Sequence, residues 1–330
     1  MIISGASLTA LFTGFDLIFQ RAFDYYPSYF ADIASVTRSS TKRQEYPWLK
    51  RTIGMREWVG ERVLQALETN NFSVINRHFE ATEAIDRDDL EDDVQGVYEP
   101  MISELGRITK VHPDLLIFGM LKAALANIDN PSGAAYDMNG VSVGVPVCYD
   151  GVTLFSAAGH PVGPAGDTVA VPNINSGGGG NPYWLLIDCS RAMRPLLYQV
   201  RKPYEAVHMA APTDEWVFNQ RMYRYGVDGR DAVAPGLWQL IYASNMDLSV
   251  AANYDAARTA MRQIKNDNGL PFGSWANAKG RYLVVPPSLE GTAKRLMHAE
   301  FGAGEGANAA VPTTNIWKGD AELIVSEYLE

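Results

Sequence analysis

Two short stretches of the sequence contain side chains of the types that perform hydrolysis. The segment "GVSVG", Gly140 to Gly144, matches the G-x-S-x-G pattern that holds a nucleophilic serine where a strand turns into a helix. The loop "NPSGAAYDMNG" precedes it and "VPVCYDG" follows it, so no helix is expected after Ser142. His160 lies in a turn, ten residues after Asp150. A hydrogen-bonded loop histidine and a chance serine match are the better interpretations.

No motif supports a nucleotide or metal site. "GAGEGA", residues 302–307, can be written G-x-G-x-x-A, but it follows a predicted helix, the reverse of the order in a dinucleotide-binding loop. The five histidines are scattered, Cys148 and Cys189 cannot form a four-cysteine zinc site, and "DRDDLEDD" lacks calcium-loop spacing. A paired-carboxylate hydrolase has no positive support, since the distance between carboxyl groups is not visible in a sequence. The sequence therefore predicts no catalytic residue, no cofactor and no metal.

The composition indicates a folded, acidic protein. The 330 residues are 47 % hydrophobic, enough for one or two cores, and 29 Gly and 18 Pro indicate many turns. The formal charge of −10, without a long Lys/Arg cluster, excludes nucleic-acid binding by counterion release. "MIISGASLTALF" has no basic start and precedes no long apolar run, so neither a signal peptide nor a membrane span is expected. We expect synthesis in the cytoplasm.

An aromatic helix and a ribbon are predicted in the first part of the chain. Helical spacing over residues 7–24 gives a stripe of apolar side chains: Leu8, Leu11, Phe12, Phe15 and Phe19. This stripe could pack on the chain's own core or dock on another subunit, and the sequence does not rank the two. The segments on both sides of Asn70 and Asn71 predict a long, half-polar β ribbon that would need support from another surface.

A long helix and a turn-rich insertion follow. The helical pattern after the acidic run predicts the longest helix, with a break at Pro113. Residues 128–182 are dominated by Gly, Pro and Asn, which indicates an insertion rich in turns. Next come the predicted strands "YWLLID", "LLYQV" and "YEAVHM" and two more strands around a turn at Asp228 and Gly229.

The last part of the chain mixes helices and strands. "NYDAARTAMRQIKNDNG" predicts a helix that stops at "NDNG". "RYLVVPPSLEGTAKRLM" predicts a buried strand, Tyr282 to Val285, ended by two prolines, and a helix that begins at Leu289 with Ser288 as its cap. The segment between the strand and the helix contains no glycine-rich loop that could bind a phosphate. We therefore expect a purely structural strand-to-helix connection there and not a ligand site.

Five blocks of the sequence resemble the major head subunit T family of phage Mu and Mu-like prophages. In chain order they are "YPWLKRTIGMREWVGERV", "NRHFEATEAIDRDDLEDD", "ELGRITKVHPDLLIFGMLKAA", "YRYGVDGRDAVAPGLWQLIYAS" and "RYLVVPPSLEGTAKRLM". The resemblance extends from Leu8 to the final strand and rests on long phrases in the same order. It implies an α+β fold of the Hong Kong 97 type, a structural shell protein without catalytic residues.

The resemblance also implies a succession of parts. These are an N-terminal arm and connector (1–54), an extended β-ribbon loop (55–92), the spine helix of a peripheral domain (93–127), the turn-rich insertion (128–182), the peripheral-domain sheet (183–248) and an axial domain (249–330). In the usual family order the axial domain precedes the final peripheral strands, whereas here it follows them. This order predicts a circular permutation of the fold, which is tolerable where chain ends lie close together at a surface.

The implied function is the major capsid protein of a Mu-like tailed bacteriophage or prophage. Such a protein assembles with itself in the host cytoplasm into hexamers and pentamers of an icosahedral head, and encloses double-stranded DNA without sequence-specific binding. Portal, scaffolding, maturation-protease and decoration proteins are the implied partners. The acidic charge agrees, because an acidic inner wall repels packaged DNA. The candidate inter-subunit contacts are Leu11, Phe12, Phe15, Phe19, Trp58, Asn70, Asn71, Asp267 and Asn268.

Three alternatives stay open at this point. An encapsulin-like nanocompartment uses the same fold to enclose cargo enzymes in place of DNA. A soluble hydrolase would use Ser142 or His160 of the glycine-rich insertion. In a covalently cross-linked shell, lysine and asparagine side chains of different subunits would be joined. Lys50 and Asn71 are candidates for this by residue type alone. The matching blocks favour the viral shell.

Overall fold

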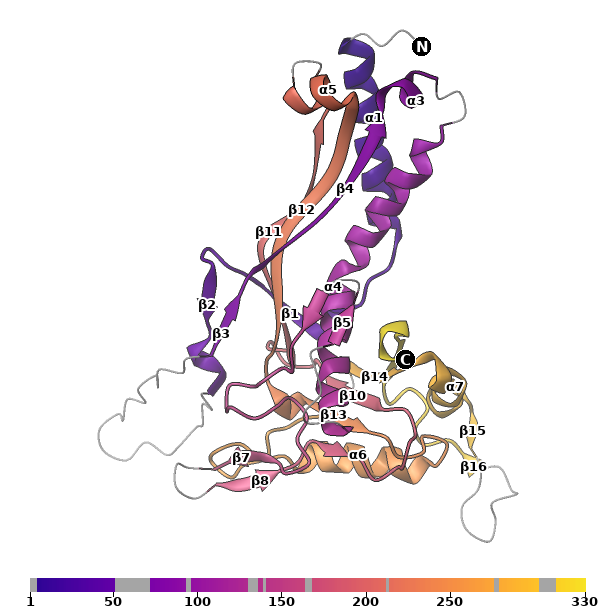
Figure 1. Ribbon diagram of the computed structural model, residues 1–330. Helices are drawn as coiled ribbons and strands as arrows, with labels where there is room; N and C mark the ends of the chain where they lie inside the picture. The colour runs from indigo at the N-terminus through magenta and orange to yellow at the C-terminus, as the bar shows by residue number, and fades with distance from the viewer. Residues whose placement is uncertain are drawn as a thin grey trace.

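The computed structural model describes residues 5–50, 72–92, 96–129, 136–138, 141–163, 168–211, 214–275, 279–302 and 313–330. The fold is α+β and consists of a long arm and a wider base (Figure 1). The arm contains α1 (Gly5–Tyr25), most of α4 (Tyr98–Asp129) and a four-stranded sheet, and the base is built around a five-stranded sheet. The N-terminus lies at the far end of the arm, and the C-terminus lies beside the base.

The predicted aromatic stripe forms one face of α1, and that face is buried within the chain. Phe12, Phe15 and Phe19 pack in a cluster with residues of α4 and the arm sheet. The two helices approach closely at Gly106, where a Cβ atom would lie 2.5 Å from the carbonyl oxygen of Phe19. The arm therefore depends on tight packing between α1 and α4.

Helix α4 continues through Pro113, so the predicted break is wrong. Proline removes one N–H from the helix ladder, but the helix is buried on both sides of it, and this packing outweighs the local cost. The carboxylate of Asp114 accepts the backbone N–H groups of Tyr29 (3.0 Å) and Phe30 (2.6 Å), at the start of α2 (Phe30–Ile33). By length and composition α4 could cross a membrane, yet 61 % of its apolar window is buried in the chain, as in a core helix.

The arm sheet has the order β1 (Ala34–Arg38), β11 (Leu196–Met209), β12 (Met222–Pro235), β4 (Arg77–Asp86). β1 runs parallel to β11, and the other pairs are antiparallel. β12 continues through Asp228 and Gly229, so the predicted turn there is wrong. Gly229 pairs with Phe79, and a Cβ at Gly229 would lie 2.6 Å from ring carbons of Tyr204. The glycine permits this close approach instead of a turn.

Two short helices lie at the far end of the arm. α5 (Glu215–Gln220) connects β11 to β12, in a segment interpreted from the sequence as a strand. α3 (Arg87–Asp92) follows β4. Figure 1 places both beside the start of α1.

The predicted ribbon over residues 55–92 is corrected in its second half. Residues 77–86 form β4 and pair with β12, so they belong to the arm sheet. A smaller ribbon pairs β2 (Arg43–Glu45) with β3 (Ser73–Ile75), and η1 (Pro47–Lys50) follows β2. Trp58, Asn70 and Asn71, three of the candidate contacts, lie outside the described residues.

The base sheet has the order β17 (Glu322–Val325), β14 (Arg281–Val285), β10 (Trp184–Asp188), β13 (Ile241–Ser244), β9 (Ile174–Asn175). Every residue of β10 and β13 is buried, which is expected of a sheet with both faces covered. One face packs on α4 and the insertion. The other packs on α6 (Ala251–Gln263) and α7 (Glu290–His298).

This sheet combines strands from both sides of the predicted boundary between residues 248 and 249. β10 and β13 come from the segment predicted as the peripheral sheet, and β14 and β17 from the segment predicted as the axial domain. The β11–β12 hairpin, which lies between β10 and β13 in the chain, extends along the arm. The base sheet therefore crosses the predicted boundary.

The corner after β14 matches the expectation with one exception. β14 is buried, Pro286 and Pro287 follow it, and α7 begins after a 3-10 turn, η3 (Pro287–Leu289). The N-cap residue of α7 is Leu289 and no side chain caps the helix, so the predicted Ser288 cap is wrong. The remaining elements are short: β5 (Tyr136–Met138), β6 (Val141–Val143), β7 (His160–Val162), β8 (Val169–Val171), η2 (Trp238–Leu240), β15 (Phe301–Gly302), β16 (Thr313–Thr314) and η5 (Glu327–Leu329).

Candidate functional site

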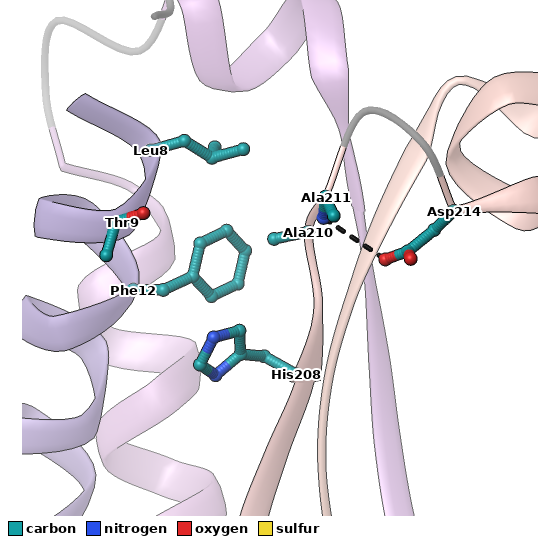
Figure 2. Close-up of a pocket in the computed structure, with 7 residues that line it drawn as sticks. All are labelled: Leu8, Thr9, Phe12, His208, Ala210, Ala211 and Asp214. Atoms are coloured by element: carbon teal, nitrogen blue, oxygen red, sulfur yellow. Dashed lines mark hydrogen bonds between the residues drawn. The ribbon is translucent and has the colours of Figure 1, made fainter. Parts of the chain in front are cut away.

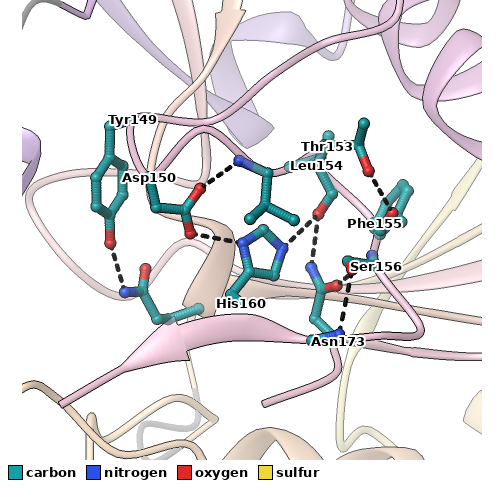
Figure 3. Close-up of polar contacts among 11 residues, drawn as sticks. Tyr149, Asp150, Thr153, Leu154, Phe155, Ser156, His160 and Asn173 are labelled. Carbon is teal, nitrogen blue, oxygen red and sulfur yellow. Dashed lines mark hydrogen bonds and ion pairs between the residues drawn. The ribbon is translucent and has the colours of Figure 1, made fainter. Parts of the chain in front are cut away.

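His160 lies in a buried polar network in the insertion (Figure 3). Its Nδ1 is 2.7 Å from Oδ2 of Asp150, and its Nε2 is 3.3 Å from the carbonyl oxygen of Leu154, which also accepts a hydrogen bond from Asn173. The ring stacks on Trp238 with 4.1 Å between centroids. Both ring nitrogens have partners and the side chain has no exposed surface, so it is not placed to contact a substrate. The expected hydrogen-bonded loop histidine is thus found, and its contact with Asp150 stabilises the loop.

Ser142 does not sit on a nucleophile elbow. It lies within β6, opposite Asp137 of β5, and its carbonyl oxygen accepts a hydrogen bond of 2.7 Å from Arg77. No helix follows this strand in the described residues. Burial raises the pKa of the Cys148 thiol well above its usual value and that of Cys189 to about 12, so neither is an activated nucleophile. Within the described ranges, no group of three His, Cys, Asp or Glu is placed to hold a metal.

The three phenylalanines predicted as inter-subunit contacts are covered by their own chain. Phe12, Phe15 and Phe19 are 1 %, 3 % and 6 % exposed. The Phe12 ring stacks on His208 with 4.9 Å between centroids, and all three phenylalanine rings lie near Tyr225. The structure favours the packing alternative for these residues, whereas Leu11 remains only partly buried.

A second buried network, which no sequence motif indicated, joins α4 to β11 and β12. Oδ2 of Asp231 accepts hydrogen bonds from the hydroxyls of Tyr198 (2.6 Å) and Tyr204 (2.8 Å), and the Tyr204 hydroxyl is 2.7 Å from Nδ1 of His112. Burial raises the pKa of Asp231 to about 6, although both tyrosine hydrogen bonds act to lower it. Burial also lowers the pKa of His112 to about 4. The network therefore favours uncharged groups between the helix and the hairpin.

Asp114, two residues further along α4, has a related environment. Burial raises its pKa to about 6, and the N–H groups of Tyr29 and Phe30 act in the opposite direction. These contacts attach the segment between α1 and β1 to α4. Two buried carboxylates thus lie close to the place where the arm meets the base.

The far end of the arm exposes large aromatic side chains. We define the distal tip as residues 214–224. Val217 of α5 is buried against the α1 cluster, but Phe218 is 80 % exposed. The guanidinium of Arg224 lies 3.4 Å from the ring centroid of Trp216. Arg221 ends α5 with φ 55° and binds both carboxylate oxygens of Asp88 in α3, at 2.7 and 2.8 Å. The distal tip is therefore held in place by the buried Val217 and by the ion pair between Arg221 and Asp88.

A pocket of about 320 Å³ lies between α1 and the end of β11 (Figure 2). We call it the arm pocket. Its lining combines apolar and polar side chains: Leu8, Thr9, Phe12, His208, Ala210, Ala211 and Asp214. Asp214 Oδ2 accepts the N–H of Ala211 at 3.1 Å, so the first residue of the distal tip also forms one wall of the pocket.

The remaining candidates, Asp267 and Asn268, lie in an exposed turn of the base after α6. Oδ1 of Asn266 accepts the N–H groups of Asn268 and Leu270, both at 3.0 Å, and Asp267 accepts the N–H of Gly163 at 3.4 Å. The candidates that lie within the described residues, in α1 and in this turn, are thus at separate places and form no single site. Phe218 was missed because "EWVFNQ" has strand-like composition, although Asp214 and Glu215 at its start are typical of a helix beginning.

Comparisons with known proteins agree with this architecture. The family model described as Mu-like prophage major head subunit gpT matches residues 8–137 and 140–329. The "Major capsid protein" of Escherichia phage Mu is 35 % identical over 335 residues, all of both chains. The "Mu-like prophage FluMu major head subunit" of Haemophilus influenzae is 34 % identical over 327 residues, 97 % of each chain.

Solved capsids match the whole fold. The procapsid of bacteriophage JBD30 matches with a TM-score of 0.75 and 32 % identity over 99 % of this chain and 100 % of that one. The capsid of the same phage matches with a TM-score of 0.71 and 25 % identity over 100 % of both chains. The expected α+β fold of a phage shell protein is confirmed. The chain belongs to the Mu-like prophage major head subunit gpT family.

Proposed function

We propose that this chain, a major capsid protein and component of the virion, assembles into hexamers and pentamers that form the icosahedral head of a Mu-like tailed phage or prophage around double-stranded DNA. The observation that carries the proposal is the match of the whole chain to the JBD30 procapsid. The family is structural and not enzymatic. The buried His160 network fits this assignment because it stabilises a loop and faces no substrate.

The shape of the molecule supports a role in a shell. The arm is long, and its sheet alternates half-buried and exposed residues along β11, so it leaves surface for neighbouring copies. Many modest contacts of this kind add up across an assembly. The charge of −10 supports an inner wall that repels packaged DNA and so permits filling and ejection.

We assign the parts in terms of the Hong Kong 97-type fold. Helix α4 is the spine helix, and the arm with its sheet is the peripheral domain. The base, with its five-stranded sheet, is the axial domain near the capsomer centre. The β2–β3 ribbon is assigned to the extended loop.

Portal, scaffolding, maturation-protease and decoration proteins are the proposed partners. A JBD30 capsid is decorated with minor capsid protein trimers, which supports a decoration protein in this assembly as well. Covalent stitching is not part of the proposal, because Lys50 and Asn71 were candidates only by residue type.

Electron microscopy of the protein expressed alone tests the proposal. We expect hexamers, tubes or closed shells, whereas a protein that stays monomeric under all assembly conditions would contradict it. Particles purified from induced host cells provide the second measurement. Shells that contain DNA support the viral function, and shells that contain a cargo enzyme and no DNA would favour the nanocompartment alternative.

A further inference from the structure

Asp231, Tyr204 and His112 form a hydrogen-bonded chain from β12 through β11 to α4. Oδ2 of Asp231 lies 2.8 Å from the Tyr204 hydroxyl, and this hydroxyl lies 2.7 Å from Nδ1 of His112. Asp231 is 1 % exposed, whereas Tyr204 and His112 are half-buried. The carboxyl group is thus nearly sealed from solvent, and the chain leads from it to a more accessible ring.

The number of protons in this chain fixes its direction. The Tyr204 hydroxyl carries one proton, so it donates to Asp231 or to His112 but not to both. An ionised carboxylate can only accept. With Asp231 ionised, Tyr204 therefore donates to Oδ2, and Nδ1 of His112 must carry the proton of the second contact. Nε2 of the neutral ring is then unprotonated, and no described residue forms a hydrogen bond with it.

Neutralisation of Asp231 reverses the chain. A proton on Oδ2 makes the carboxyl group a donor to the Tyr204 oxygen, and the Tyr204 hydroxyl then donates to an unprotonated Nδ1 of His112. Oδ1 is buried and has no partner among the described residues, so a proton placed there would lack an acceptor. Tyr198 also donates to Oδ2, at 2.6 Å, but its hydroxyl has no second acceptor in the described part of the chain.

The surrounding groups favour a neutral ring and a neutral carboxyl. Burial raises the pKa of Asp231 to about 6 and lowers that of His112 to about 4. Arg77, opposite Asp231 in the register of β4 and β12, acts to lower both pKa values. Burial and the charge of Asp231 raise the pKa of both tyrosines, so both stay protonated, and Asp114 on α4 adds to this effect at Tyr198.

We propose that His112, Tyr204 and Asp231 form a proton relay that makes the contact between α4 and the β11–β12 hairpin responsive to pH. Water delivers one proton to Nε2 of His112, and the Nδ1 proton passes to the Tyr204 oxygen. The hydroxyl proton of Tyr204 passes in turn to Oδ2 of Asp231. The chain gains one proton in total: the carboxylate becomes neutral, the tyrosine is unchanged, and the histidine changes its tautomer. The helix and the hairpin stay connected while the buried charge disappears.

Nitrogen NMR of the histidine rings tests the relay, because protonated and unprotonated ring nitrogens resonate at clearly different frequencies. The full chain is labelled in the rings of its five histidines, and the His112 signals are those lost in His112→Gln. Solution spectra serve for free chains and magic-angle-spinning spectra for shells, so the test does not depend on assembly. We expect the proton on Nδ1 above about pH 7 and on Nε2 near about pH 5, with a midpoint at the pKa of Asp231, about 6.

Two matched variants separate a relay from simple packing. Both tyrosines bind the same oxygen of Asp231, but only Tyr204 reaches His112. Tyr198→Phe should therefore keep the tautomer change, whereas in Tyr204→Phe the ring should no longer follow Asp231. Asp231→Asn removes the titrating group, so its His112 should keep one tautomer between about pH 5 and pH 7.

Three results overturn the proposal. The first is a wild-type His112 ring whose tautomer does not change between about pH 7 and pH 5. The second is a ring protonated on both nitrogens near about pH 6, which would place the charge on His112 in place of neutralising Asp231. The third is a Tyr204→Phe protein whose ring changes as in wild type. The wild-type titration decides the first two even where a variant does not fold.

Discussion

The arm and the base of this molecule are stabilised in different ways. In the base, β10 is buried along its whole length between two layers. In the arm, β11 is buried only where it reaches the base and then alternates half-buried and exposed residues toward the far end. The base thus completes its own core, whereas the arm sheet is covered mainly on one side and leaves much of β11 exposed toward the far end.

The arm and the base also differ in how their buried carboxylates are hydrogen-bonded. In the base, Asp320 accepts hydrogen bonds from Tyr254 (2.8 Å), Trp275 (3.1 Å), Arg258 (3.1 Å) and Arg281 (2.8 Å). These donors act together to lower the pKa of Asp320, against the effect of burial. In the arm, Asp231 has two tyrosine donors and, among the described residues, no cation in hydrogen-bond contact. The base therefore uses a buried ionic centre, and the arm uses aromatic packing around a poorly neutralised carboxylate.

Removal of the ionic centre should have the largest effect on stability. Asp320→Ala leaves Arg281, whose side chain is 9 % exposed, without its carboxylate and removes the partners of Tyr254 and Trp275. We expect the free energy of unfolding to fall by about 5 kcal/mol, because breaking a buried ion pair strands a charge. Urea unfolding followed by tryptophan fluorescence measures it, since Trp184, Trp238, Trp275 and Trp317 lie in the base.

Glu300→Ala is the control for this prediction. Glu300 pairs with Lys318 at 3.2 Å, and their side chains are 73 % and 48 % exposed. An exposed ion pair contributes at most about 1 kcal/mol. Similar small losses for both variants would mean that the Asp320 cluster does not stabilise the base.

The aromatic core of the arm is tested by Phe12→Ala. Phe12 is 1 % exposed, so the variant should lose about 3–4 kcal/mol of unfolding free energy. Leu17→Ala on the same helix is the control, since Leu17 is 65 % exposed and should change stability by less than about 0.5 kcal/mol. A Phe12→Ala protein of normal stability that fails to assemble would restore the inter-subunit alternative for this ring.

The buried carboxylate of the arm predicts a specific pH dependence. The pKa of Asp231 is raised from 3.8 to about 6, so between these values the folded chain binds the proton more strongly than the unfolded chain. Its contribution to stability is present below the unfolded pKa and is lost as the pH rises through the folded pKa. In Asp231→Asn this contribution is absent. From about pH 4 to pH 7 the variant should gain about 2–3 kcal/mol relative to wild type.

Urea unfolding of both proteins at several pH values checks this prediction. The raised pKa of Asp114 and the lowered pKa of His112 act in both proteins and largely cancel in the difference. The lowered pKa of His112 favours folding as the pH rises, which is the opposite direction to Asp231. Parallel pH curves for the two proteins would mean that Asp231 titrates normally in the folded chain.

The local elements of both regions could be predicted because their signals are local. The spacing of Phe12, Phe15 and Phe19 is sufficient to predict α1, and the apolar run before two prolines predicts β14. The assembly of the sheets could not be predicted, because strand partners lie far apart in the sequence. β10 and the start of β11 are both buried apolar strands, yet they belong to different sheets.

The wrong local predictions have the same physical cause. Pro113 and Gly229 are ordinary signals for a helix end and a turn, but contacts with remote residues override both. The candidate contacts also differ in whether their exposure could be predicted. The exposure of Asp267 follows from its own turn, which is a local signal. The burial of the apolar stripe of α1 depends on β12, which is remote in sequence.

The smallest effect we predict concerns two glycines in the helices of the arm. Gly106→Ala should destabilise the protein by about 1–2 kcal/mol, because the added Cβ would lie 2.5 Å from the carbonyl oxygen of Phe19 and force α1 away from α4. Gly14→Ala should stabilise it by up to about 1 kcal/mol, since a Cβ there meets no atom within 4 Å and alanine favours the helix. Thermal unfolding of the two variants measures the difference. If both variants became more stable by the same amount, α1 would have room to move away from α4. The tight packing between these two helices, which distinguishes the arm from the base, would then not exist.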